Sequence, residues 1–281
     1  MPELPEVEIV RRNISELLLS GNSIKSWTFN RADLRFPIPK KQLSRLIGQK
    51  ISQVQRRAKY LLFHVEEQVI LSHLGMTGQW RAEEDQTWIA QKHDHVVLSL
   101  SSGKSLVFHD PRRFGFIEVL PAEMLTSRFS ALGPEPLDKD MDPGRLTDTF
   151  LQLKSPVKTA LMNQRYLVGV GNIYAAEALF RAGIHPLKKC SQIKPADYAL
   201  LWREVRLILE EAIKSGGSSI ENYRNTYSQS GQYQERLQVY GRTGEPCVKC
   251  HSLIINTFLA GRNTFWCPSC QKKKLDNRKK I

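Results

Sequence analysis

The first residues of the chain could supply a nucleophile and a proton carrier. The sequence opens Met1-Pro2-Glu3, and removal of the methionine, which a small second residue permits, would expose a secondary amine beside a carboxylate. Because an α-amino group has a pKa of about 8, part of it would be neutral at cellular pH. Such an amine could attack a sugar C1′ or an aldehyde to give an iminium, and Glu3 could transfer the proton.

The same residues are also typical of a helix start. Pro5 suits the first helical position, and the nearby glutamates suit the first turn. Apolar residues then recur at helical spacing until Gly21; they are Val7, Val10, Ile14, Leu17 and Leu18. A helix is compatible with the chemistry because it would hold Pro2 on a rigid element.

A second chemical signal is a set of cysteines in two CxxC pairs. They are Cys247, Cys250, Cys267 and Cys270. Two turns of this kind can present four thiolates to Zn²⁺ and leave no open position, so the sequence predicts one structural zinc ion. The strand between the pairs leads to a hairpin tip that would expose Arg262, either as a solvated side chain or as a phosphate contact. The remaining cysteine, Cys190, is interpreted as structural.

Three further segments have the composition of nucleic-acid contacts. Residues 110–115, Asp-Pro-Arg-Arg-Phe-Gly, predict a tight loop whose guanidinium and aromatic ring could fill the space left by an extruded base; a core phenylalanine with surface arginines is the alternative. The turn at 73–78 could offer Met76 as a second filler. Glycines at 169 and 171 precede a helix and could approach an anion, although a plain helix–turn–helix junction also explains them.

Two other charged segments have simpler interpretations. The basic run at 55–60 favours the solvated face of a strand. His93-Asp94-His95 resembles a metal cluster, but no third ligand lies near in the sequence. Structural hydrogen bonding is therefore favoured there.

The charge balance indicates the class of partner. The 281 residues include 41 Lys and Arg against 28 Asp and Glu, a net charge of +13. This excess favours a polyanionic partner, nucleic acid first and an anionic membrane second. No apolar run approaches the ~20 residues of a membrane span, and the acidic start lacks a secretory signal. The expected setting is the cytoplasm.

The apolar pattern divides the chain into a β-rich half and a helical half. Short runs predict a sandwich or flattened barrel between residues 22 and 120; they lie at 51–54, 60–65, 69–74, 95–100, 105–108 and 116–120. After a Pro- and Gly-rich linker the period becomes helical, at 143–153, 157–162, 172–182 and 195–214. The polar segment at 217–236 predicts a mobile loop.

In this order, the segments resemble the bacterial formamidopyrimidine-DNA glycosylases, a family that includes endonuclease VIII. The resemblance covers essentially the whole chain, through MPELPEVE, QRRAKYLL, HLGMTG, HDH, DPRRFG, LGPEPL, VGVGNIYAAEALF, GIHP, QVYGRTGEPC and the four-cysteine ribbon. The ELPEVE opening resembles the branch that acts on oxidised purines. The chain departs from the family pattern at Thr159, Ala160, Asn163 and Ala176, which puts only local phosphate contacts in doubt.

The resemblance implies an α+β fold in several domains. These are an N-terminal catalytic β-sandwich domain with a leading helix (1–132), a linker (133–139), and a helical domain with a helix–two-turns–helix element and a lesion loop (140–236). A zinc ribbon (237–271) and a basic tail (272–281) complete the chain.

The resemblance also implies catalytic roles. Pro2 would attack C1′ of the damaged nucleotide, and Glu3 would handle the proton that opens the sugar ring. Glu6 would hold the helix start in place. Lys59 and Arg262 would assist while they contact phosphates beside the lesion.

Further residues would contact the DNA. Met76, Arg112 and Phe114 would replace the flipped base, with Arg112 facing the orphaned cytosine. The other expected members of the DNA-binding site are Glu6, His73, His95, Arg113, Lys158, Asn172, Tyr240 and Arg262.

The implied activity is that of a bifunctional glycosylase and lyase. It would release 8-oxoguanine and formamidopyrimidines through an iminium on Pro2 and then cut the strand by β- and δ-elimination. The expected partner is damaged double-stranded DNA in the bacterial cytoplasm, with no membrane, no small-molecule cofactor and a monomeric chain. Two alternatives remain open: a family enzyme for oxidised pyrimidines, and a noncatalytic lesion-binding protein on the same scaffold.

Overall fold

The computed structural model describes residues 1–18, 21–84, 88–219 and 224–272. It divides into two compact units: unit 1 comprises residues 1–131 and 212–234, and unit 2 comprises residues 132–211 and 235–281, as far as they are described. Helix α7 (Pro195–Lys214) belongs to both. Part of the predicted loop, 220–223, and the predicted basic tail beyond 272 lie outside the described residues.

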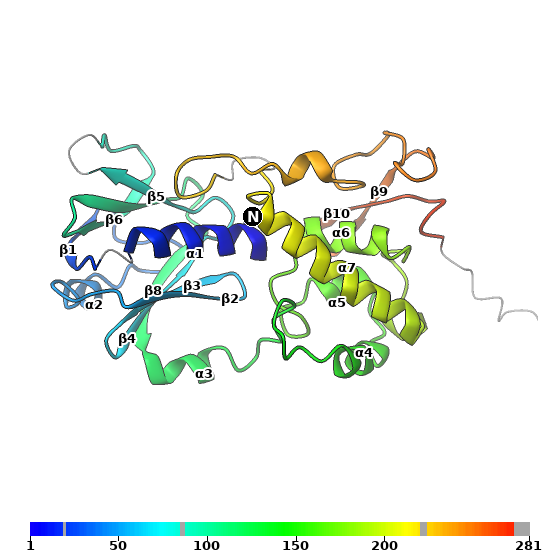
Figure 1. Ribbon diagram of the computed structural model, residues 1–281, viewed down its shortest axis with the longest axis horizontal. Coiled ribbons are helices and arrows are strands. Elements are labelled where there is room, and N and C mark those ends of the chain that lie inside the picture. The colour runs from blue at the N-terminus through cyan, green and yellow to red at the C-terminus, as the bar shows by residue number, and fades with distance from the viewer. Residues whose placement is uncertain (19–20, 85–87, 220–223, 273–281) are drawn as a thin grey trace, which may run out of the picture. The chain divides into compact units, whose positions relative to one another are not determined.

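Unit 1 contains two four-stranded antiparallel sheets (Figure 1). Their strand orders are β1-β6-β7-β5 and β2-β3-β4-β8. The strands are β1 (Ile24–Phe29), β2 (Gln53–Arg57), β3 (Tyr60–Val65), β4 (Gln68–His73), β5 (Gln79–Glu84), β6 (Asp94–Leu100), β7 (Lys104–His109) and β8 (Phe116–Pro121). Trp80 of β5 has its ring centroid 5.8 Å from that of Phe63 in β3 and 5.0 Å from that of Phe108 in β7. Because rings from both sheets meet in one core, the unit is a β-sandwich, as predicted.

The sequence patterns found six of these strands and missed β1 and β5. In β5 only Trp80 and Arg81 are buried, and its other residues are polar or small. The strand exists because its backbone pairs with β7 along its whole length. A local apolar pattern does not report such long-range pairing, and the same is true of β1, which pairs with β6.

The leading helix α1 (Leu4–Leu18) begins directly after Glu3, whose backbone N–H is capped by a side chain of the first turn. The carbonyl of Glu3 accepts from the Val7 N–H at 3.1 Å, and the Glu6 carboxylate accepts from the Glu3 N–H at 2.8 Å. Such a side chain, three residues into a helix, satisfies a donor that the helix itself leaves unpaired. Pro5 is the second helical residue, one place later than predicted, where its missing N–H is equally harmless. The helix packs along β2 (Figure 1).

Unit 2 contains the four helices that the periodicity predicts (Figure 1). They are α4 (Pro143–Leu151), α5 (Val157–Leu161), α6 (Asn172–Arg181) and α7. Asp142 caps α4 by accepting from the N–H groups of residues 144 and 145 at 2.8 and 3.1 Å. Phe150 of α4 and Trp202 of α7 meet edge to face, with ring centroids 4.9 Å apart.

A β-hairpin ends the described chain, formed by β9 (Ile255–Leu259) and β10 (Arg262–Trp266). Its two turn residues, Ala260 and Gly261, have φ of 48° and 76°, as a two-residue hairpin turn requires. The shorter helical elements of the chain are α2 (Lys40–Ser44), α3 (Leu125–Arg128), and the 3₁₀ turns η1 (Ala122–Met124), η2 (Cys190–Gln192) and η3 (Tyr233–Arg236). Among the described residues, none of the helices has the length and apolar character of a membrane span.

Candidate functional site

The predicted nucleophile and proton carrier lie at the buried start of α1. Pro2 is buried, and Glu3 and Glu6 are each 2 % exposed. One Glu6 oxygen accepts from the Glu3 N–H and the other from the Ser218 N–H, each at 2.8 Å. Glu6 therefore joins the start of α1 to the first residues of the predicted lesion loop. With Met1 removed, Pro2 would carry a secondary amine next to a carboxylate that water barely reaches.

Lys59 sits in the tight turn between β2 and β3 and is 7 % exposed. Its neighbour Ala58 has φ of 54°, a left-handed conformation. The Arg56 guanidinium donates to the Ala58 carbonyl at 2.9 Å and to the Glu8 carboxylate of α1 at 3.2 Å. This pair of contacts holds the turn of Lys59 against α1.

His73, at the end of β4, is a neutral imidazole. Its Nδ1 accepts from the Gly75 N–H at 3.0 Å, so Nε2 carries the proton, and its ring stacks on Phe116 with centroids 5.5 Å apart. Burial lowers the pKa of His73 to about 4, helped by the positive charges of Lys59 and Arg35. At neutral pH the side chain can therefore donate from Nε2 without carrying a charge.

The substitution His73→Gln is expected to reduce the loss of stability in acid. The pKa of folded His73 is about 4, against an ordinary value of 6.5. Between pH 6.5 and about pH 4 the unfolded chain therefore binds more protons than the folded chain. The contribution of His73 to stability is complete above pH 6.5 and is lost as the pH falls toward 4. The loss is on the order of 3 kcal/mol at most. Urea unfolding at neutral pH and near pH 4 checks this, and an equal acid loss in both proteins would contradict it.

The predicted base-replacing residues lie on two adjacent turns of unit 1. Met76 is 37 % exposed and Phe114 is 43 % exposed, so both side chains are accessible to a partner. The Arg112 guanidinium lies over the Phe114 ring, 4.8 Å from its centroid. Arg113, exposed between them, has φ of 57°. The loop thus presents a cation and an aromatic ring together.

The His93-Asp94-His95 segment is held by hydrogen bonds, as its sequence favours. The buried Asp94 carboxylate accepts from Arg81 at 3.0 and 3.1 Å and lies 2.8 Å from Nδ1 of His109. His95 Nε2 donates to the Asp110 carbonyl at 2.9 Å, and burial lowers the pKa of His95. His95 therefore supports the loop that carries Arg112.

In unit 2, Lys158 is a buried lysine in α5. It is 1 % exposed. Its ammonium donates to Asn172 Oδ1 at 2.6 Å, to Thr264 Oγ1 at 2.7 Å and to the Asn263 carbonyl at 3.2 Å. Asn172 Nδ2 donates to the same carbonyl at 3.1 Å. The family resemblance implies a phosphate contact for Lys158; in the structure its ammonium is turned inward and connects α5, α6 and β10.

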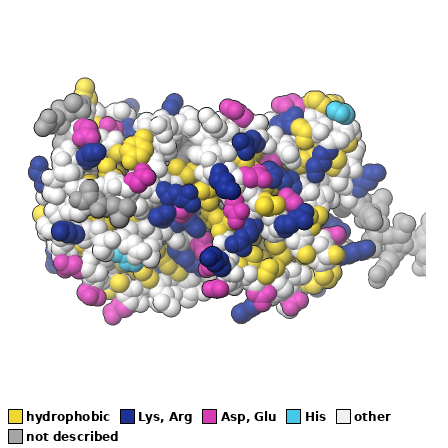
Figure 2. Space-filling model, in the orientation of Figure 1, with side chains coloured by type: hydrophobic (Ala, Val, Ile, Leu, Met, Phe, Trp, Pro, Cys, Tyr) yellow, Lys and Arg dark blue, Asp and Glu magenta, His cyan; other side chains and the backbone are white. Residues whose placement is uncertain are grey.

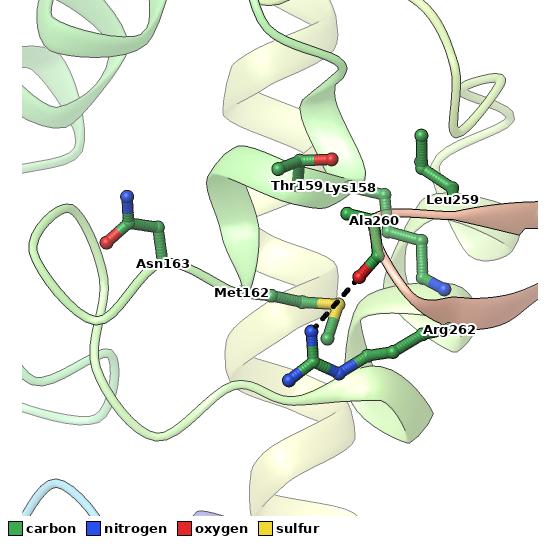
Figure 3. A pocket seen from close by; sticks show the side chains of 7 residues that line it. All are labelled: Lys158, Thr159, Met162, Asn163, Leu259, Ala260 and Arg262. Atoms are coloured by element: carbon green, nitrogen blue, oxygen red, sulfur yellow. Dashed lines mark hydrogen bonds between the residues drawn. The ribbon is translucent and has the colours of Figure 1, made fainter.

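Arg262 lies at the exposed end of β10, beside a pocket of about 220 Å³ (Figure 3). The pocket is lined by Lys158, Thr159, Met162, Asn163, Leu259, Ala260 and Arg262. The guanidinium makes a long contact of 3.5 Å with the Ala260 carbonyl. Among the described residues, the other donors of the guanidinium make no hydrogen bond.

The segment that precedes the ribbon is attached to α6 by a buried carboxylate. Glu177 is 0 % exposed and accepts from the N–H groups of Gln238, Val239 and Tyr240 at 2.9 Å each. The Tyr240 ring packs on Phe265 of β10 with centroids 5.0 Å apart. These contacts position Tyr240 beside the hairpin.

The four predicted ligand cysteines come together. Their sulfur atoms all lie within 4.8 Å of one another, and among the described residues they are the one cluster of three or more potential ligands. Cys247 and Cys270 have sulfurs 3.9 Å apart, and Cys250 and Cys267 have sulfurs 3.4 Å apart. Tetrahedral zinc with Zn–S bonds of about 2.3 Å requires sulfurs about 3.8 Å apart. The cluster can therefore hold a metal ion.

Basic side chains are not confined to one element. On the face shown in Figure 2, Lys and Arg side chains recur over both units. This distribution agrees with the net charge of +13 and suits a polyanion.

Comparison with known proteins identifies the family. Residues 1–117 match the formamidopyrimidine-DNA glycosylase N-terminal domain, and residues 132–224 match the H2TH domain of the same enzymes. The formamidopyrimidine-DNA glycosylase of Bdellovibrio bacteriovorus is 43 % identical over 97 % of this chain and 100 % of its own. The chain belongs to the formamidopyrimidine-DNA glycosylase family.

Solved structures agree with this assignment. A variant of Lactococcus lactis FPG in complex with DNA containing Fapy-dG has a TM-score of 0.90 and 35 % identity, covering 97 % of this chain and 100 % of that one. MutM in complex with DNA containing carbocyclic 8-oxo-G has a TM-score of 0.88 and 36 % identity, with the same coverage. As a family member, the chain is a base-excision-repair glycosylase for oxidised purines with abasic-site lyase activity.

Some residues of the site were not singled out from the sequence. Thr77 and Asp110 join the turns at 73–78 and 110–115 by a hydrogen bond, and the Ser218 N–H donates to the Glu6 carboxylate. Thr77 and Asp110 lie inside the quoted motifs HLGMTG and DPRRFG, so motif membership was an available signal for them. Ser218 lies in the predicted loop at 217–236, but its contact with Glu6 has no sequence signal, because the two residues are 212 positions apart.

Proposed function

We propose that Pro2, once Met1 is removed, is the nucleophile of this glycosylase and lyase. The observation that carries the proposal is the capped start of α1, where a buried Glu3 adjoins Pro2 and Glu6 fixes the backbone between them. Confinement of an amine and a carboxylate on one rigid element pre-arranges both for reaction.

The proposed reaction has two stages. The Pro2 nitrogen attacks C1′, and the bond from C1′ to the oxidised purine breaks, so the base leaves with the bonding pair and takes up a proton. Glu3 carries a proton to the ring oxygen O4′ as the sugar opens, which leaves an iminium. Loss of a C2′ proton then expels the 3′ phosphate, and a second elimination expels the 5′ phosphate. Lys59 and Arg262 assist by contacting phosphates beside the lesion.

Extrusion of the base is assigned to the exposed side chains of the two turns. Met76 and Phe114 would fill the vacated space, and Arg112 would pair with the orphaned cytosine. An extruded base costs a few kcal/mol of stacking and pairing, which this insertion would offset. The residues at 217–236 would close on the extruded base.

The DNA backbone would be held by both units. Asn172 and Arg262 are proposed to contact phosphates, and Lys158 to orient Asn172 through their 2.6 Å hydrogen bond. The other proposed contacts are His73, His95, Arg113 and Tyr240. The four cysteines would hold one structural zinc ion that folds the ribbon and takes no part in the chemistry.

Arg262→Ala is expected to weaken binding to lesion-containing and undamaged duplexes alike. Loss of one phosphate contact should also lower the slope of log affinity against log salt by about one unit. Titration at several salt concentrations measures both quantities. Arg203→Ala is the matched control, because Arg203 is exposed on α7 and has no proposed DNA contact. Equal slopes for native chain and Arg262→Ala would overturn the assignment of Arg262.

Borohydride trapping tests the catalytic proposal. The native chain is mixed with a duplex that carries one 8-oxoguanine opposite cytosine, and the reduced covalent adduct is mapped by peptide. An adduct on the N-terminal peptide supports Pro2, and an adduct on another peptide refutes it. No adduct, with Met1 shown absent and lesion binding intact, would leave a noncatalytic lesion-binding protein. A parallel duplex with thymine glycol tests a preference for oxidised pyrimidines.

The domain limits and setting complete the proposal. The proposed domains are a catalytic domain at 1–132, a linker at 133–139, a helical domain at 140–236, a ribbon at 237–271 and a tail at 272–281. Damaged duplex DNA is the proposed partner of a monomeric chain in the bacterial cytoplasm. The complexes of its relatives with damaged DNA support this partner.

A further inference from the structure

We propose that Thr77 and Asp110 lock the two base-replacing turns into one rigid wedge, which makes Thr77 a positioning residue for extrusion of the damaged base. The two turns are residues 73–78, which present Met76, and residues 110–115, which present Arg112 and Phe114. The inference rests on the proposed function, because it requires these side chains to enter the DNA.

A single hydroxyl group connects the turns. Thr77 Oγ1 donates to Asp110 Oδ1 at 2.5 Å and accepts from the Arg112 N–H at 3.1 Å. Asp110 Oδ2 accepts from the Gly115 N–H at 2.8 Å. Thr77 directly follows Met76 in the sequence. The Thr77 side chain therefore fixes the backbone next to Met76 and also the backbone of Arg112, the residue proposed to face the orphaned base.

Asp110 is itself anchored to the sandwich. It is 0 % exposed, its N–H donates to the His93 carbonyl at 3.0 Å, and its carbonyl accepts from His95 Nε2 at 2.9 Å. The same carbonyl accepts from the Arg113 N–H at 3.2 Å. The Asp110 carboxylate is therefore held in place by the sandwich. Its hydrogen bond with the Thr77 hydroxyl holds the turn at 73–78 in place as well.

Backbone packing joins the turns independently of these hydrogen bonds. Gly75 has φ of +62°, and a Cβ built on it would lie 2.3 Å from the Phe114 carbonyl carbon. A Cβ on Gly115 would lie 2.9 Å from the His73 carbonyl oxygen. Glycine at both positions permits the close approach. The two turns are thus in backbone contact, while the side chains of Met76, Arg112 and Phe114 stay exposed.

A preformed wedge lowers the cost of extrusion. The positions of Met76, Arg112 and Phe114 are fixed when the chain folds. Little conformational entropy therefore has to be lost when these side chains enter DNA. Loss of the Thr77 hydroxyl leaves the Arg112 N–H and Asp110 Oδ1 without their partner and loosens one turn against the other. The effect should fall on release of a base that must be extruded, and spare cleavage at a site that has no base.

The variants Thr77→Val and Thr77→Ser test the proposal as a matched pair. Valine keeps the shape and removes the hydroxyl, whereas serine keeps the hydroxyl. Thr77→Val is expected to release 8-oxoguanine about tenfold more slowly in single turnover, with strand cleavage at a preformed abasic site unchanged. Thr77→Ser is expected to match the native chain in both assays. Melting temperatures of the variants establish that they fold alike.

Fluorescence supplies a readout that general loss of structure would not produce. With 2-aminopurine beside the lesion, Thr77→Val is expected to slow the rise in fluorescence that accompanies unstacking. Equal behaviour of Thr77→Val and Thr77→Ser, or an equal loss on both substrates, would overturn the inference.

Phe114→Ala distinguishes failure of this inference from failure of the proposed wedge. If Phe114→Ala releases 8-oxoguanine as fast as the native chain, the wedge itself is wrong. If Phe114→Ala releases 8-oxoguanine slowly and Thr77→Val releases it at the native rate, the proposed wedge is supported. In that case only its coupling through Thr77 is wrong.

Discussion

Replacement of Pro2 by glycine is expected to lower strand cleavage at 8-oxoguanine by on the order of 100-fold, a rise in barrier of about 3 kcal/mol. A secondary amine gives a cationic iminium directly, and the proline ring holds its nitrogen in one orientation at the start of α1. Glycine offers a primary amine with a freely rotating backbone, so it retains some reactivity but loses this pre-arrangement. Single-turnover cleavage, followed with Met1 shown to be absent, measures the loss.

The control for this variant is Pro5→Ala. Pro5 lies on the same helix but has no amine to offer, so its replacement should leave cleavage and trapping close to native. Full activity of Pro2→Gly, together with a trapped peptide that contains Lys59, would transfer the nucleophile to that lysine. Melting curves of both variants separate a chemical effect from loss of the helix start.

Removal of one ligand cysteine is expected to unfold the ribbon and abolish tight DNA binding. Metal binding contributes roughly 10–16 kcal/mol to the folding of small zinc domains, far more than a short hairpin gains from its own packing. Cys250→Ala is the most informative variant, because Cys250 is exposed and its replacement opens no cavity in the core. Zinc content, circular dichroism and affinity for lesion DNA should all fall together.

Cys190 provides the matched control for the ribbon. It is buried, and its carbonyl accepts from the Tyr198 hydroxyl at 2.9 Å, a backbone contact that Cys190→Ala retains. That variant should keep its zinc and its DNA affinity, with only a modest loss of stability from the missing sulfur. A Cys250→Ala protein that keeps metal, hairpin and affinity would show that the cluster is not what folds the ribbon.

Ribbon collapse would also release contacts within unit 2. The ammonium of Lys158 bonds to Asn263 and Thr264 of the hairpin as well as to Asn172. When β10 unfolds, Lys158 loses two of these acceptors, and the loss of hydrogen bonds to a buried ammonium is costly. Loss of zinc is therefore expected to disturb the start of α6 as well as Arg262.

Features that depend on neighbouring residues were predictable from the sequence. The four helices of unit 2 follow the period of their apolar residues, and the hairpin between the cysteine pairs follows its turn residues. The ligand set Cys247, Cys250, Cys267 and Cys270 came from spacing alone, and the sulfur positions agree with it. The proposed reactive pair Pro2-Glu3 could also be recognised from the sequence, because the proposed chemistry depends on residue types at adjacent positions.

Features that depend on contacts between residues distant in the sequence were determined only by the tertiary structure. β5 exists through pairing with β7, although its own residues have no strand pattern. The family resemblance implies a phosphate contact for Lys158, whereas folding turns its ammonium toward Asn172 and the hairpin. Thr77 acquires its role only because Asp110, 33 residues away, comes within 2.5 Å. Sequence patterns report local periodicity and residue chemistry, whereas these contacts arise from the packing of segments that are distant along the chain, and only the folded chain brings them together.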